Sequence, residues 1–125
     1  MVRAVGIVLI AALGIVAMPP RAAETGDAAR EIRLVARDMT FYLEGSDAPN
    51  PTLRLRAGET VRLVLRNEDR GMKHDFTVPA WKAATPLIRA MRETAVTITA
   101  PVRGARAAYH CTPHEETMRG TIIVE

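Results

Sequence analysis

The sequence predicts an all-β domain built as a sandwich of two packed sheets, with about eight strands. Short segments alternate between apolar and polar residues, as strands do when only one of their faces is buried. Turn residues separate these segments at the spacing typical of a β-sandwich. The chain has 125 residues, 48% of them hydrophobic, which suits a single domain with a packed core.

The N-terminal segment is expected to be a signal peptide that lies outside this fold. Arg3 precedes an uncharged apolar run over residues 4–18, and two prolines follow it. A positively charged start followed by a short apolar run is typical of a secretory signal peptide. The run is shorter than the ~20 residues that a membrane-spanning helix needs, so an uncleaved anchor is the less favoured alternative. We therefore expect a signal peptide over residues 1–23 and one domain over residues 24–125.

The clearest strands flank a turn at residues 57–59. Before the turn, Leu53 and Leu55 face one way and two arginines face the other; after it, the inward face resumes at three apolar positions of residues 61–65. Residues 80–91 lack alternation and are expected to carry a short helical turn. Further strands are predicted at residues 32–37, 39–43, 75–78, 95–99, 105–111 and 120–124.

The charge of the chain gives no support for nucleic-acid binding. Lys and Arg number 17 against 14 Asp and Glu, but removal of the expected signal peptide takes Arg3 and Arg21 with it. The remaining domain is then close to neutral. Its arginines are spread among the strands and do not cluster with aromatic residues, so we assign them to solvent faces and expect no nucleic-acid partner.

The single cysteine, Cys111, is unusual for an exported protein. An oxidising compartment favours disulfides, yet a lone cysteine cannot form one within the chain. It is therefore a buried inert thiol, bonded to another molecule, or a metal ligand. His114 and Met118 follow it between two predicted strands, and a thiolate, an imidazole and a thioether together suit copper. These neighbours favour the role of metal ligand for Cys111.

A copper site of this kind needs a second histidine from elsewhere in the chain. The arrangement that favours exchange between Cu(I) and Cu(II) is one Cys and two His in a trigonal plane, with a weak axial Met. The sequence has three histidines. His110 adjoins Cys111 on a predicted strand, where successive side chains point to opposite faces. That leaves His74, at the start of the strand predicted over residues 75–78.

Three motifs make the sequence resemble the cupredoxins of the plastocyanin, pseudoazurin and amicyanin group, over the whole region after the signal peptide. They are Leu-x-Leu-x-Ala-Gly-Glu-x-Val from Leu53, His-Asp-Phe from His74, and Tyr-x-Cys-x-Pro-His…Met…Gly-x-Ile-x-Val from Tyr109. The resemblance implies a Greek-key cupredoxin sandwich with one type 1 copper ion. It implies three strong ligands and a weak axial one, namely His74, Cys111, His114 and, in the axial position, Met118.

The resemblance also implies that groups at Asp75 and Thr112 tie the two ligand loops together by hydrogen bonds, which would orient the ligands. The sequence departs from the group in one place. Three residues separate His114 from Met118, where two or four are common. Glu115 or Glu116 therefore remains an alternative axial ligand.

The function implied by the resemblance is that of a periplasmic one-electron carrier and not of an enzyme. Its partners would be redox proteins that dock transiently on the surface around His114 and Pro113. We expect a monomer with no stable membrane association after signal cleavage. The main alternative is a copper carrier or chaperone that passes metal rather than electrons. Multicopper oxidases and nitrite reductases need more histidines than this chain has, and a metal-free structural sandwich is the remaining alternative.

Overall fold

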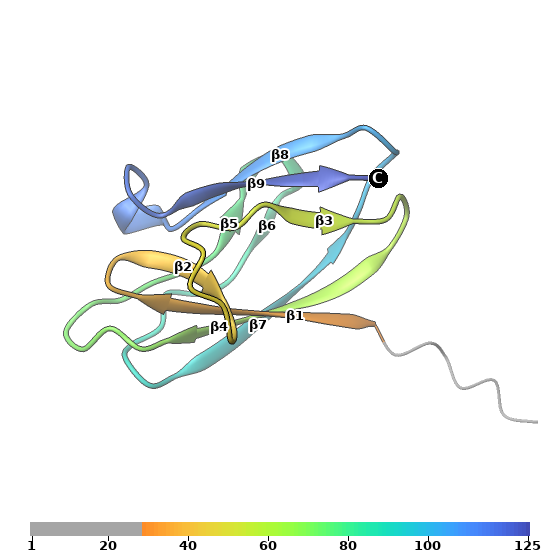
Figure 1. Cartoon of the computed structure of the whole chain (residues 1–125). Coiled ribbons are helices and arrows are strands. Elements are labelled where there is room, and N and C mark those ends of the chain that lie inside the picture. The colour runs from red at the N-terminus through yellow and green to blue at the C-terminus, as the bar shows by residue number, and fades with distance from the viewer. Residues whose placement is uncertain (1–28) are drawn as a thin grey trace, which may run out of the picture.

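A computed structural model describes residues 29–125 as a β-sandwich (Figure 1). The signal peptide expected over residues 1–23 lies outside the described residues. Two single-turn 3-10 helices, η1 (Pro79–Trp81) and η2 (Thr112–His114), accompany the strands. The strands are β1 (Arg30–Arg37), β2 (Thr40–Leu43), β3 (Leu53–Leu55), β4 (Thr60–Asn67), β5 (Thr77–Val78), β6 (Ala83–Ala84), β7 (Glu93–Thr99), β8 (Arg106–His110) and β9 (Arg119–Val124).

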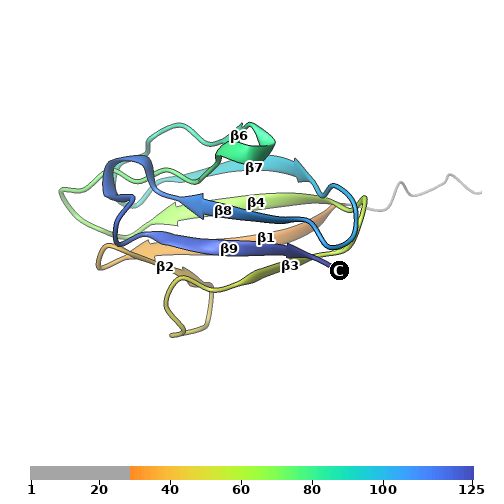
Figure 2. The same ribbon diagram turned by 90° about the horizontal axis from the view of Figure 1, so that it is seen from above.

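The strands form two sheets, with orders β2-β1-β4-β7 and β3-β9-β8-β5-β6. β1 pairs in parallel with β4, and β3 pairs in parallel with β9, so the chain crosses from one sheet to the other more than once. Seen from above, β8 and β9 lie over β1 and β4 (Figure 2). The predicted all-β sandwich is therefore confirmed.

The alternating segment around the turn at residues 57–59 spans both sheets. β3 pairs with β9 in one sheet, whereas β4 pairs with β1 and β7 in the other. Leu53 and Leu55 nevertheless face the same core as Leu63 and Leu65, and all four are buried. Each sheet thus presents its apolar positions to the space between the sheets, as the alternation predicted.

The segment over residues 80–91 contains both a helical turn and a short strand. The predicted turn is η1, which Pro79 begins. The strand is β6, which has only two residues, Ala83 and Ala84, and pairs with β5. A two-residue strand has no periodicity to detect, so the sequence predicted about eight strands where the described residues contain nine.

Aromatic side chains fill the core between the sheets. Phe41, Phe76 and Tyr109 are fully buried. The rings of Phe76 and Tyr109 stack with centroids 5.1 Å apart, and Phe41 meets both edge-on. Tyr109 lies directly against Gly120, where any side chain would collide with its ring, and its hydroxyl donates a hydrogen bond to the Pro51 carbonyl at 2.5 Å. Phe76 and Tyr109 lie two residues from His74 and Cys111, so this packing holds the strand ends beside the candidate ligands.

Within residues 29–125, no helix is long and apolar enough to cross a membrane. The two helices there are single 3-10 turns of three residues each.

Candidate metal centre

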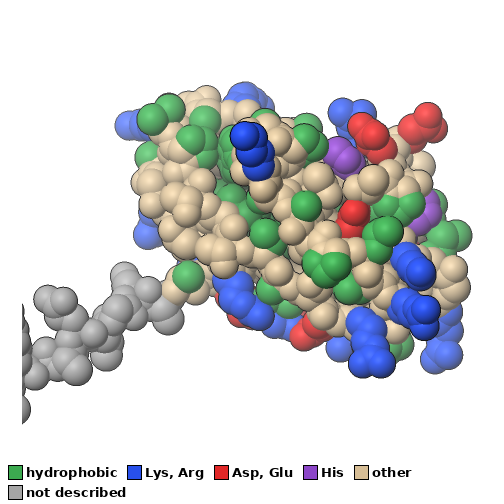
Figure 3. All heavy atoms as spheres, turned by 180° about the vertical axis from the view of Figure 1, so that it is seen from behind, with side chains coloured by type: hydrophobic (Ala, Val, Ile, Leu, Met, Phe, Trp, Pro, Cys, Tyr) green, Lys and Arg blue, Asp and Glu red, His purple; other side chains and the backbone are tan. Residues whose placement is uncertain are grey.

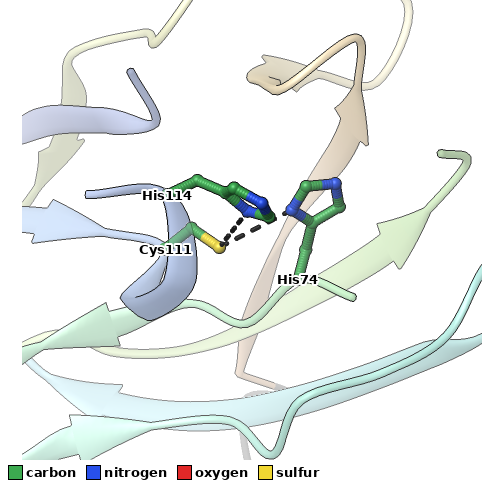
Figure 4. Close-up of side chains that lie close together, drawn as sticks. All are labelled: His74, Cys111 and His114. Carbon is green, nitrogen blue, oxygen red and sulfur yellow. Dashed lines mark hydrogen bonds between the residues drawn. The ribbon is translucent and has the colours of Figure 1, made fainter. Parts of the chain in front are cut away.

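His74, Cys111 and His114 meet at the end of the sandwich where the β4–β5 connection and η2 lie (Figures 1 and 4). Cys111 directly follows β8, and His114 ends η2. His74 precedes β5 and pairs in an isolated antiparallel bridge with Ile88. Strand ends and this bridge therefore position ligands that lie 37 residues apart in the chain.

The donor atoms are arranged as one metal ion would need them. Cys111 Sγ lies 3.6 Å from Nδ1 of His74 and 3.6 Å from Nδ1 of His114. All three donor atoms lie within 4.8 Å of one another. Three donors placed at 120° around an ion, at bond lengths of about 2.0–2.3 Å as zinc–nitrogen and zinc–sulfur bonds have, would be separated by similar distances. One thiolate and two imidazoles are also the equatorial donors of a type 1 copper site.

Burial differs among the three side chains. His74 and Cys111 are fully buried, whereas His114 is only partly buried. Burial raises the pKa of the Cys111 thiol to about 11. A thiol with this pKa stays protonated and unreactive at neutral pH, unless a cation takes the place of its proton.

The loop over residues 111–118 closes on itself through backbone hydrogen bonds. The Cys111 N–H donates to the Met118 carbonyl at 2.9 Å, and the Met118 N–H donates to the His114 carbonyl at 2.9 Å. The His114 N–H donates to the Cys111 carbonyl at 3.2 Å. A side-chain amide from outside the loop, that of Asn50, donates to the Thr117 carbonyl at 3.0 Å. The three-residue gap between His114 and Met118 is thus accommodated in an ordered loop that returns Met118 beside Cys111.

The candidate axial ligands differ in their exposure. Met118 is fully buried within the core, whereas Glu115 and Glu116 are exposed. Burial favours the thioether over either carboxylate. Axial ligation by Met118 stays a prediction.

The hydrogen-bonded tie between the two ligand loops, implied by the resemblance, is present. The Thr112 N–H donates to Oδ1 of Asp75 at 2.6 Å, and the hydroxyls of Thr77 and Thr112 lie 3.4 Å apart. This contact links the residue after His74 to the residue after Cys111. His110, expected to be no ligand, lies in β8 in register with Arg119 of β9 and outside the cluster.

Asp69 and Asn67 contact this site, and sequence reasoning had given neither of them a role. Oδ2 of Asp69 lies 2.8 Å from Nε2 of His74. The side-chain amide of Asn67 donates to the carbonyls of Met72 and Ile88. These two hydrogen bonds tie the segment that precedes His74 in the chain to Ile88. Metal-binding histidines usually have a hydrogen-bond partner on the other ring nitrogen, so an acidic residue close before His74 was the available signal.

No protein-family model and no curated protein matches this sequence. Solved structures do match it. The chain is similar to auracyanin B, with a TM-score of 0.62 and 20% identity over 78% of this chain and 89% of that one. Auracyanin A, a blue copper protein from Chloroflexus aurantiacus, gives a TM-score of 0.61 and 21% identity over 78% and 99% of the two chains.

A reduced Cu(I) form of an amicyanin variant gives a TM-score of 0.50 and 27% identity, over 82% of this chain and 88% of that one. The likenesses to the auracyanins concern the fold, and the donor set described above is this chain's own. The resemblance inferred from the sequence is therefore confirmed: this chain has the cupredoxin fold, and His74, Cys111 and His114 lie together in it as a type 1 copper site requires.

Proposed function

We propose that this protein is an exported, periplasmic one-electron carrier that holds one copper ion. The observation that carries the proposal is the meeting of one cysteine sulfur and two histidine nitrogens at 3.6 Å, where two of the three side chains are fully buried. His74, Cys111 and His114 would be the strong ligands and Met118 the axial one. Copper bound there supplies exchange between Cu(I) and Cu(II).

The residues around the site support rapid electron exchange because they hold the ligands in place. The closed loop over residues 111–118, the Asp75–Thr112 hydrogen bond and the bridge between His74 and Ile88 each restrict one ligand segment. A site whose ligands barely move between the two oxidation states loses little energy to reorganisation, which suits electron transfer and not bond-making chemistry.

Electrons would leave and enter through His114. It is the one ligand of the three with partial exposure, and Pro113 beside it is exposed. Histidine side chains reach the surface at one end of the molecule (Figure 3). A redox protein docked weakly on this surface would approach the ring of His114 directly, while the protein itself stays monomeric.

A copper carrier that passes metal to a partner is the alternative function. The partial exposure of His114 would let an incoming ligand reach the ion. The full burial of His74 and Cys111 favours retention of the metal instead. Reversible voltammetry separates the two functions, since only the electron carrier needs a stable site in both oxidation states.

The experiment that tests copper binding uses protein purified after expression of the full chain. Cu(II) is added, and the visible and EPR spectra are recorded for wild type, Cys111→Ser and His110→Gln. We expect an intense thiolate-to-copper band in wild type and in His110→Gln, because His110 is no ligand, and its loss in Cys111→Ser. The assignment is wrong if wild type lacks the band or Cys111→Ser keeps it.

A further inference from the structure

A carboxylate lies against the most buried histidine of the candidate copper site. Oδ2 of Asp69 is 2.8 Å from Nε2 of His74, on the side of the ring away from Cys111. The His74 side chain is fully buried, and the side chain of Asp69 is 13% exposed. A charged group this poorly hydrated interacts more strongly with its neighbours than a surface carboxylate does.

Backbone N–H groups in the turn between β1 and β2 hold the Asp69 carboxylate in place. Asp38 N–H donates to Oδ1 at 2.6 Å, and Met39 N–H donates to Oδ2 at 3.0 Å. Both turn residues have positive φ, 50° at Asp38 and 56° at Met39, which points their N–H groups at one acceptor. The Asp69 N–H in turn donates to Oδ1 of Asn67 at 2.8 Å. The carboxylate is therefore fixed independently of any metal.

Both oxygens of the Asp69 side chain accept a backbone N–H, one from Asp38 and one from Met39, as the oxygens of a carboxylate do. Among residues 29–125, no Lys or Arg forms an ion pair with Asp69. Its negative charge is thus directed at the His74 ring.

The second histidine has no comparable partner. Nδ1 of His114 faces Cys111, and among the described residues no carboxylate contacts its ring. The two imidazoles, whose ring centroids are 4.9 Å apart, therefore differ in their electrostatic surroundings. The carboxylate contacts the buried ring of His74 and not the ring of His114, which is expected at the docking surface.

We propose that Asp69 is a positioning residue that keeps the proton of His74 on Nε2, leaves the Nδ1 lone pair directed at the metal position, and lowers the reduction potential of bound copper. The positioning half concerns the chain alone, and the redox half rests on the proposed function. A carboxylate that accepts the Nε2 proton makes the opposite nitrogen a stronger donor. Stronger donation and a nearby negative charge both stabilise Cu(II), the ion with the higher charge, more than Cu(I).

The positioning half is tested without copper. Long-range ¹H–¹⁵N NMR of the metal-free protein at pH 8 reports which nitrogen of each histidine carries the proton. We expect His74 as the Nε2–H form in wild type, with a smaller population of that form in Asp69→Ala. A wild-type His74 protonated on Nδ1, or one unchanged by Asp69→Ala, overturns this half.

The redox half is tested by the midpoint potentials of copper-loaded wild type, Asp69→Asn and Asp47→Asn. Asp47 is a matched control because it loses the same charge from a side chain that is 100% exposed. We expect Asp69→Asn to weaken the preference for Cu(II) about tenfold, which raises the potential by about 59 mV. Asp47→Asn should leave the potential unchanged. An equal shift in the two variants overturns the redox half.

The two proposals fail in different ways. If wild type shows no thiolate-to-copper band, the proposed function fails, whereas the NMR result still decides the positioning of His74. If copper binds and Asp69→Asn shifts nothing beyond the control, the function stands and the role of Asp69 is wrong. Far-UV circular dichroism checks that each variant is folded, and Asp69→Ser replaces Asp69→Asn should the latter not fold.

Discussion

At the scale of single residues, the environment of Cys111 explains how the single cysteine of the chain can remain unpaired. Its side chain is fully buried, and burial raises the pKa of the thiol to about 11. A protonated thiol shielded from solvent is a poor nucleophile in thiol–disulfide exchange. Only a partner already inside the site can use this sulfur, and His74 and His114 supply the rest of such a site.

The axial position is tested by Met118→Leu, a volume-conserving change that costs less than about 1.5 kcal/mol of stability. We expect the thiolate-to-copper band to persist, because the three equatorial donors remain. The reduction potential should rise by roughly the equivalent of a tenfold change in the Cu(I) to Cu(II) ratio, since the axial ligand tunes it. Voltammetry of Met118→Leu, Glu115→Gln and Glu116→Gln measures this. A shift in either Gln variant, with none in Met118→Leu, would assign the axial position to that carboxylate.

The sequence predicted the residues of the cluster but not the contact between Asp69 and His74. Cys111 and His114 were predictable from their donor types and close spacing. His74 was predictable because the chain has three histidines and His110 adjoins Cys111 on a strand, where successive side chains point to opposite faces. The contact with Asp69 depends on the turn between β1 and β2 meeting the β4–β5 connection. Spacing along the chain does not encode such an approach, so the sequence offers an acidic residue before His74 as a candidate partner but does not show that the two meet.

At the scale of elements, an ion pair joins the start of β1 to the turn between β3 and β4. Nε of Arg30 lies 2.6 Å from Oε1 of Glu59, and Nη2 lies 3.1 Å from Oε2. The Arg56 N–H donates to Oε2 of Glu59 at 2.8 Å, within the turn itself. The turn thereby fastens the edge where the chain passes between the two sheets.

This ion pair predicts an acid-dependent contribution to stability. The hydrogen bond from Arg30, then that from the Arg56 N–H, lowers the pKa of Glu59 to about 2. Because the folded pKa lies below the ordinary value of 4.5, the contribution is complete above pH 4.5 and is lost as the pH falls toward 2. Glu59→Gln should lower the free energy of unfolding by up to about 1 kcal/mol at pH 7.

Urea denaturation of wild type and Glu59→Gln at pH 7 and pH 3 measures the difference, which should shrink at the lower pH. Glu125→Gln is the matched control, because Glu125 pairs with Arg54 on the surface, where both side chains are more than half exposed. We expect a smaller effect from it. A difference between Glu59→Gln and wild type that is the same at both pH values contradicts the prediction.

The long strands could be predicted from the sequence more completely than the short ones. β4 has eight residues, and its inward positions Val61, Leu63 and Leu65 were predicted from the alternation, although Val64 among them is buried as well. β5 is shorter than the strand predicted over residues 75–78. The Asp75 side chain accepts a hydrogen bond from the Thr112 N–H, and the Phe76 N–H donates to the Thr85 hydroxyl and not to a neighbouring strand. β6 escaped prediction because its two residues, Ala83 and Ala84, are defined by pairing with β5 alone.

At the scale of the whole molecule, most of the core is formed by residues that are not candidate copper ligands. The core cluster contains twenty buried residues drawn from both sheets, and Cys111 and Met118 are the only two of these expected to bind copper. The loops at the site are held by hydrogen bonds between protein groups. The site should therefore exist in nearly its final form before copper arrives.

Removal of copper tests this independence. The copper-free protein should keep the far-UV circular dichroism of a β-sandwich and unfold cooperatively, in contrast to zinc fingers, whose fold depends on the metal. Copper at a hundred times its dissociation constant should add about 2.7 kcal/mol to the free energy of unfolding. For a domain of this size that corresponds to a rise of roughly 10–20 °C in Tm. Cys111→Ser, which lacks the sulfur ligand, should show a much smaller rise. A copper-free wild type with the spectrum of an unfolded chain would mean that the metal, and not the packing of the sheets, holds the ligand loops together.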